Sequence, residues 1–166
     1  MDRKVKALFS SGYFRLGRYG GASVRVHWTT PVGLFFFSGF SFNPLVWAAL
    51  LLIVLTHEVG HALLARRYHL HVLAIDVTAI GGACRLAGDP SPREVALVAW
   101  GGVLAQAALL VGALCVRAVV SFMTAGLVDG LFDTLITSNA VLIGINLLPI
   151  KPLDGADAWR LFRGQA

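Results

Sequence analysis

The sequence predicts an all-α membrane protein with about four membrane-spanning helices. Of its 166 residues, 57% are hydrophobic and 14% are charged, and the mean hydropathy is +0.73. A soluble domain carries about 25% charged residues, so this composition favours the membrane class. Four apolar segments are candidate spans or part-spans: Val26–Phe42, Leu45–Ala65, Val95–Val116 and Leu131–Ile150. The first is short and contains Pro31 and Gly33.

No polar linker or low-complexity tract divides the chain, and no internal repeat is visible. We therefore expect one compact bundle. Its parts are a cytoplasmic N-terminal segment over residues 1–25 and a single membrane domain over residues 26–166.

The basic residues gather on one side of the predicted spans. Every Lys and Arg except Arg117 lies before the first span, between the second and third, or after the fourth. The positive-inside rule then places both termini and the loop 66–93 in the cytoplasm. Because topology explains the net charge of +5, we expect no nucleic-acid partner.

The second span contains an H-E-x-x-H motif. His57 and His61 are four residues apart, so a helix presents both imidazoles on one face. At that separation, two nitrogens reach one zinc ion at about 2.0–2.1 Å each. Glu58 lies beside this pair, where its carboxylate can contact a water on the metal and act as general base.

A simpler interpretation is that these polar residues only form hydrogen bonds between helices. The cost of insertion argues against it. A carboxylate at the centre of a bilayer costs about 2.5–3.5 kcal/mol, whereas each Leu, Ile or Val returns only about 0.3–0.6 kcal/mol. Because ionisable groups within membranes are by default functional candidates, the three residues together favour a metal site.

A catalytic zinc site needs a third protein ligand and an open position. Asp129 and Asp133 follow the third span and lie at the opposite membrane face from His57. The other candidates are interfacial or loop residues that nothing fixes near the motif: His27, His69, His71, Asp76, Asp89 and Glu94. His27, beside Trp28, marks the membrane boundary, and its role stays open.

Asp154, in the segment NLLPIKPLDG, is the best candidate for the third ligand. This segment ends the fourth span on the same side as His57. Pro149 and Pro152 prevent a regular helix, and broken backbone near a membrane is tolerated where protein or a water-filled cavity covers it. Asp-Gly also favours ordinary surface turns, and spacing alone leaves both interpretations open.

The two cysteines carry no predicted chemistry. Cys84 lies in the cytoplasmic loop and Cys115 near the far end of the third span, and no CxxC pair exists. We expect neither a disulfide nor a metal site from them, only two small apolar side chains.

Several segments together resemble the site-2 protease family of intramembrane zinc metalloproteases. HEVGH resembles its metal-binding helix. NLLPIKPLDG resembles its second signature, in which Asn precedes the ligand Asp by eight positions. IGGACRLAGDPSPREVALVAWGG is similar to its Gly-containing membrane-associated loop and the helix that follows. LGRYGGASVRVHWTTPVG is similar to the N-terminal part of the small, sporulation-type branch. Together they cover about residues 13–159.

The resemblance implies a core of three helices, formed by the second to fourth spans, with one extra N-terminal span. It implies one zinc ion held by His57, His61 and Asp154, with Glu58 as the catalytic base. It also places Asn146 near the substrate or the oxyanion.

Gly81 and Gly82 match the family loop that helps to present an unwound substrate. The surrounding segment Leu73–Leu86 contains β-branched and apolar residues, and it can pair with the substrate as an added strand. An interfacial hairpin without a substrate role is the alternative, and both stay open.

The third span departs from the family pattern. It reads GGVLAQ, so Gly102 replaces the usual Pro, Ala105 replaces the Asn three residues later, and Gln106 is one position off. This puts in question a polar contact from the third span, but not the metal site itself.

The implied activity is hydrolysis of a peptide bond in or near a transmembrane segment of a membrane-protein substrate. No segment resembles a PDZ domain and no room remains for a C-terminal regulatory domain, so we expect control by a membrane-bound regulator. Compact size and the resemblance favour the bacterial plasma membrane. The alternative is a non-proteolytic module that binds or transports metal, or an inactive protease that binds a partner.

Overall fold

In the computed structural model, the described residues are 12–120 and 129–163. The first 11 residues of the predicted cytoplasmic segment, residues 121–128, and the last three residues of the predicted membrane domain lie outside these ranges. The predicted division of the chain at residue 26 stays a prediction.

A four-stranded sheet is the main departure from the predicted fold. Its strands, in spatial order, are β1 (Tyr13–Tyr19), β2 (Ala22–His27), β3 (His71–Thr78) and β4 (Gly81–Ala87). Strands β1 and β2 are antiparallel, β2 and β3 are parallel, and β3 and β4 form an antiparallel hairpin. The hairpin expected around Gly81 is therefore part of a larger mixed sheet, and the prediction of an all-α protein is wrong.

Two described helices are long and apolar enough to cross a membrane: α3 (Pro44–Arg67) and α4 (Pro92–Val120). They coincide with the second and third predicted spans. The prediction of about four spans is wrong, because the first and fourth predicted spans are each divided into shorter elements. Val26–Phe42 is divided between the end of β2 and a helix of eight residues, α2 (Thr30–Phe37).

The fourth predicted span, Leu131–Ile150, is also divided. It consists of α5 (Asp129–Asp133), a π-helical turn η1 (Thr134–Ser138) and α6 (Asn139–Asn146). Irregular backbone with two prolines follows and leads to the short helix α7 (Gly155–Ala158) and a 3₁₀ turn η2 (Trp159–Leu161). These pieces do not form one long regular span.

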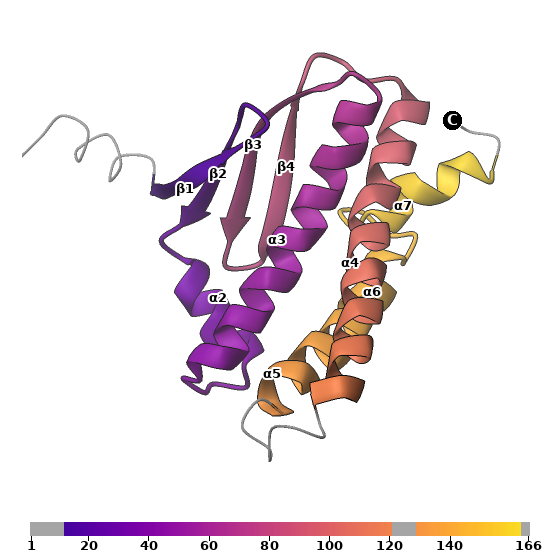
Figure 1. Cartoon of the computed structure of the whole chain (residues 1–166). Helices are drawn as coiled ribbons and strands as arrows, with labels where there is room; N and C mark the ends of the chain where they lie inside the picture. Colours follow the sequence, from indigo (N-terminus) through magenta and orange to yellow (C-terminus); the bar gives the residue numbers. More distant parts are fainter. Residues whose placement is uncertain (1–11, 121–128, 164–166) are drawn as a thin grey trace, which may run out of the picture.

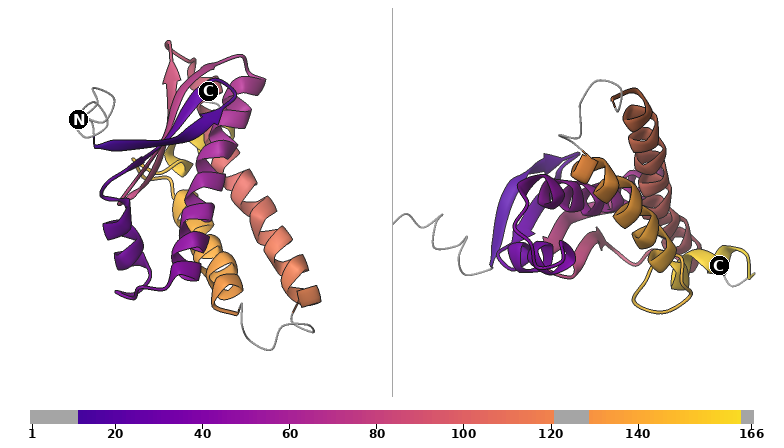
Figure 2. Two further views of the ribbon diagram at one scale, coloured as in Figure 1. Left: turned by 60° about the vertical axis from the view of Figure 1, so that its left-hand side comes forward. Right: turned by 90° about the horizontal axis from the view of Figure 1, so that it is seen from below.

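Helix α3 lies between the β3–β4 hairpin on one side and helix α4 on the other (Figure 1). The views in Figure 2 show the same layers from two further directions. Gly60 and Gly101 allow α3 and α4 to touch, because a Cβ atom on either glycine would collide with the carbonyl oxygen of the other. A hydrophobic core formed by residues of α3, α4, α5 and η1 fills one end of the helical bundle: Ala49, Ile53, Ala113, Phe132 and Leu135.

Asp76 joins three strands through a buried charge cluster. Its side chain is 1% exposed and binds Arg25 through two hydrogen bonds of 2.7 and 2.9 Å. Arg85 approaches the second carboxylate oxygen at 2.7 Å. The hydrogen bond to Asp76 raises the pKa of Arg25. Asp76 therefore stabilises the sheet and is not available as a metal ligand.

We expect Asp76→Asn to lower the free energy of unfolding by about 3 kcal/mol, because it leaves Arg25 and Arg85 without their shared counter-charge. Thermal unfolding in detergent measures the effect. Asp133→Asn is the matched control, since Asp133 and its partner Arg117 are 59% and 40% exposed and such surface pairs contribute about 0–1 kcal/mol. Equal losses in the two variants would contradict the role given to Asp76.

Candidate metal centre

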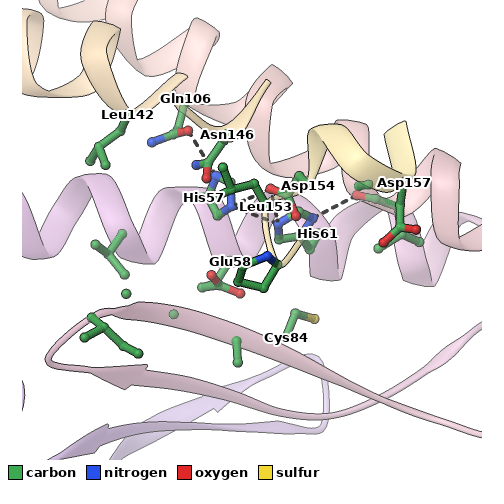
Figure 3. A pocket seen from close by; sticks show the side chains of 18 of the residues that line it. His57, Glu58, His61, Cys84, Gln106, Leu142, Asn146, Leu153, Asp154 and Asp157 are labelled. Atoms are coloured by element: carbon green, nitrogen blue, oxygen red, sulfur yellow. Dashed lines mark hydrogen bonds and ion pairs between the residues drawn. The ribbon is translucent and has the colours of Figure 1, made fainter. Parts of the chain in front are cut away.

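Three side chains meet at one point between α3 and the loop before α7. The Oδ2 atom of Asp154 lies 2.9 Å from Nε2 of His57 and 3.3 Å from Nε2 of His61. The two Nε2 atoms are 2.9 Å apart, and all three ligand atoms lie within 4.8 Å of one another (Figure 3). The helix brings the histidines together, as their spacing predicts, and the fold adds Asp154 from far along the chain.

The outer nitrogens of both rings already have hydrogen-bond acceptors. Nδ1 of His61 lies 2.8 Å from the backbone carbonyl oxygen of Val98, and Nδ1 of His57 lies 3.0 Å from Oε1 of Gln106. Each neutral ring therefore keeps its proton on Nδ1 and presents a bare Nε2. Two bare nitrogens and a carboxylate at such distances repel one another unless a cation lies between them, so the residues fit a zinc ion.

Glu58 lies beside the ligand set without joining it. Its side chain is buried, with 3% exposure, and its carboxylate lies close to the backbone of Cys84 on β4. Oε2 has no hydrogen-bond partner among the described residues. The side chain of Glu58 lines the same cavity, of about 610 Å³, as the two histidines and Asp154. A buried carboxylate with one oxygen lacking a partner among the described residues therefore lies next to the ligand set.

The loop that carries Asp154 is fixed by the end of α6. A Cβ atom at Gly155 would collide with the carbonyl oxygen of Leu147, so only glycine allows this close approach. The indole N–H of Trp159 donates to the same carbonyl at 2.6 Å. The Asp-Gly pair is therefore packed against the bundle and is not an ordinary surface turn.

The chain is similar in sequence to proteins that are named zinc metalloproteases. No protein-family model matches the chain. The putative zinc metalloprotease Rip3 of Mycobacterium tuberculosis is 30% identical over 168 aligned residues, which cover 89% of this chain and 42% of that protein. The zinc metalloprotease MJ0392 of Methanocaldococcus jannaschii is 30% identical over 149 residues, covering 85% of this chain and 42% of that protein.

A solved structure agrees with these sequences. The site-2 protease from Methanocaldococcus jannaschii matches with a TM-score of 0.68 and 25% identity, over 92% of this chain and 72% of that chain. These similarities confirm the resemblance to the site-2 protease family that the sequence motifs indicate. The chain spans less than half the length of the curated relatives it matches.

The remaining predicted site residues line the same cavity. Asn146 lies at the end of α6, and Gly81 and Gly82 begin β4. A Cβ atom at Gly82 would collide with the side chain of Glu58. Glycine at this position therefore lets β4 pass directly against the carboxylate.

Helix α4 contributes two residues that the sequence analysis did not assign to the site. Gln106 supplies a polar contact from the third predicted span, which its departure from the family pattern had put in question. Gly102 faces both rings, because a Cβ atom there would lie 2.6 Å from Nε2 of His61 and 2.7 Å from Nδ1 of His57. The sequence did contain a signal for these two residues. Gly102 and Gln106 are four residues apart, as are His57 and His61, so each pair lies on one face of its helix.

Cys84 also lines the cavity. Burial, with a smaller contribution from the negative charge of Glu58, raises the pKa of its thiol to about 12. Its sulfur is not among the convergent ligand atoms, which belong to His57, His61 and Asp154.

Other candidate ligands from the sequence have different surroundings. The ring of His27 packs on Tyr13 and its Nδ1 lies 2.8 Å from the hydroxyl of Thr29. Glu94 accepts hydrogen bonds from the backbone and hydroxyl of Ser91 at the start of α4. None of the remaining candidates lines the cavity described above: His69, His71, Asp89, Asp129 and Asp133.

Proposed function

We propose that the chain is a zinc metalloendopeptidase that hydrolyses a peptide bond in or near a transmembrane segment of a membrane-protein substrate. One observation carries this proposal. The ligand atoms of His57, His61 and Asp154 converge at a cavity that Glu58 also lines, and the buried Oε2 of Glu58 has no hydrogen-bond partner among the described residues. A purely structural metal site has no use for such a base.

Each residue has a defined task in this reaction. Nε2 of His57, Nε2 of His61 and Oδ2 of Asp154 would hold one zinc ion. Zinc, when bound, supplies a Lewis acid and lowers the pKa of a water ligand to about 7. Glu58 accepts the proton of the attacking water at Oε2 and later delivers it to the leaving amine. Asn146 orients its side chain toward the developing oxyanion.

The sheet supports an extended substrate next to this base. Strand β4 is the last strand in the sheet order, and Gly81, Gly82 and Cys84 on it line the cavity. A transmembrane helix hides its amides in hydrogen bonds, so the substrate must unwind before cleavage. An unwound segment then pairs with the free edge of β4 as an added strand.

The setting of the reaction follows from the apolar helices and the charge pattern. Helices α3 and α4 fit membrane insertion by length and composition. Arg66 and Arg67 end α3 just beyond His61, and from the positive-inside rule we infer that the metal lies in the cytoplasmic half of the bilayer. We further propose that the protein lies in the bacterial plasma membrane with both termini in the cytoplasm. We also propose that a membrane-bound regulator controls its activity.

Gly82→Ala tests the contact between β4 and the base. We expect cleavage to fall by about 100-fold, because the added methyl group displaces the Glu58 carboxylate by the order of 1 Å. Bound zinc should be unchanged, as measured by metal analysis of the purified protein. Gly112→Ala is the control, since a Cβ atom there meets nothing within 4 Å. Normal cleavage by Gly82→Ala would show that Glu58 needs no such clearance.

The activity itself is tested with isolated membranes from a host that lacks this protein. Purified chain is added with zinc, with a zinc chelator, or with the chelator followed by excess zinc. Mass spectrometry then searches for truncated single-span proteins. We expect fragments that vanish with the chelator and return with zinc. If no membrane protein is cut, or if the chelator has no effect, a non-proteolytic metal-binding or partner-binding module is the better account.

A further inference from the structure

One face of α4 supplies both acceptors that the histidine rings use. Val98, Gly102 and Gln106 follow one another at intervals of four residues, so they form a single row along the helix. Val98 faces His61 and Gln106 faces His57. Gly102, between them, leaves room for the two rings.

The two acceptors differ in kind. His61 donates to a backbone carbonyl oxygen, which no side-chain substitution at Val98 removes. His57 donates to the amide oxygen of one side chain, Gln106. The orientation of His57 therefore depends on the identity of a single residue, whereas that of His61 depends on the helix backbone.

Gln106 is itself held in place from a third helix. Its side chain is buried, with 1% exposure, and Asn139 is fully buried. The side-chain amide of Asn139 donates to the backbone carbonyl oxygen of Gln106 at 2.9 Å. Asn139 is the first residue of α6, directly after the π-helical turn η1. These contacts join α4 to α3 through the side chain of Gln106 and to α6 through its backbone carbonyl.

We infer that Gln106 is a positioning residue for the metal centre: it holds the proton of His57 on Nδ1 and so directs the bare Nε2 toward the metal. This inference rests on the zinc site proposed above. Partners of this kind orient metal-binding histidines and raise their basicity, and their loss costs about 10–100-fold in metal affinity. In this chain the residue takes the place of the polar position that the family pattern puts one residue earlier.

The first test measures affinity for Zn²⁺ and Co²⁺ by competition with a chelator, using the purified full chain in detergent. Gln106→Met keeps the length of the side chain but removes the amide oxygen, and we expect it to bind both ions about 10–100-fold more weakly. Gln106→Glu keeps an acceptor at the same reach and should retain the wild-type affinity. If Gln106→Met binds both ions as tightly as the wild type, the inference is wrong.

The second test detects the proton on His57 directly. In the metal-free protein, ¹⁵N NMR distinguishes a ring protonated on Nδ1 from one protonated on Nε2. We expect Gln106→Met to move His57 away from the Nδ1–H form and to leave His61, with its backbone acceptor, unchanged. An unchanged His57, or equal changes in both rings, would overturn the inference.

Val103→Ala controls for loosened packing. Val103 is buried on α4, with 5% exposure, and its side chain has no polar atom. A loss of zinc affinity as large as that of Gln106→Met would assign the effect to packing and reject the positioning role. Because these measurements do not involve cleavage, a wild type that binds zinc but cuts no protein would reject the proposed function and leave this inference standing.

Discussion

Asp154→Ala is expected to remove both the bound zinc and the proteolytic activity. The substitution deletes the oxygen that lies 2.9 and 3.3 Å from the two Nε2 atoms. Two histidines then remain as protein ligands, one fewer than catalytic zinc sites use. Removing a residue that only hydrogen-bonds to a ligand lowers metal affinity by about 10–100-fold. We expect the zinc affinity of Asp154→Ala to fall by more than this. Zinc per chain after gel filtration and cleavage of the same substrate are measured together.

Asp157→Ala is the matched control for this variant. Asp157 lines the same cavity, but its carboxylate pairs with Lys151 and Arg160 and not with the histidines. We expect it to keep its zinc. Full zinc occupancy in Asp154→Ala would remove Asp154 from the ligand set, and loss of zinc from both variants would point to disruption of the whole loop.

Glu58→Gln is expected to keep its zinc and to lose cleavage. Gln has the same size as Glu, but its amide cannot take a proton from water and return it to the leaving amine. General acid–base catalysis contributes about 10²–10⁴-fold, so the rate should fall by about that factor. Because Glu58 is not placed as a ligand, zinc per chain should match the wild type.

Glu94→Gln serves as the control, since Glu94 only accepts hydrogen bonds from Ser91 at the start of α4. Its cleavage rate should equal that of the wild type. Substrate processing by Glu58→Gln at the normal rate would show that another group is the base. Loss of zinc from Glu58→Gln would show instead that Glu58 belongs to the ligand set.

The central helices were predictable because their signals are local. The apolar run of α3 and the four-residue spacing of His57 and His61 lie within one segment, and spacing alone places both rings on one face. The sheet was missed because its pairing is not local. Residues 23–26 of β2 pair in parallel with residues 74–77 of β3, and whether a short segment becomes a strand depends on such neighbours.

Basic residues also explain why the first two strands were not predicted. The segment before residue 26 carries Arg15, Arg18 and Arg25, which fit a cytoplasmic tail by the positive-inside rule. In the fold, however, Arg25 pairs with the buried Asp76. From sequence position alone, an arginine that sets membrane orientation cannot be distinguished from one that pairs with a buried carboxylate.

The outer contacts of the metal centre were equally hidden. Asp154 lies far from the histidines in sequence, and the resemblance to a family was needed to favour it over a surface turn. Gln106 lies one residue beyond the expected Asn position, and one residue turns a helix by about 100°. Only the packing of α4 on α3 shows that Gln106, and not Ala105, faces His57 with a hydrogen bond.

The most direct test of the metal centre is zinc K-edge X-ray absorption on the purified protein. The expected result is two imidazole nitrogens at about 2.0–2.1 Å from the zinc and carboxylate or water oxygen at about 2.0–2.2 Å, with no sulfur bound to the zinc. The imidazole signal should fall in His57→Ala and in His61→Ala. A zinc–sulfur distance of about 2.3 Å, for which Cys84 lines the cavity, or a spectrum unaffected by either substitution, would contradict it.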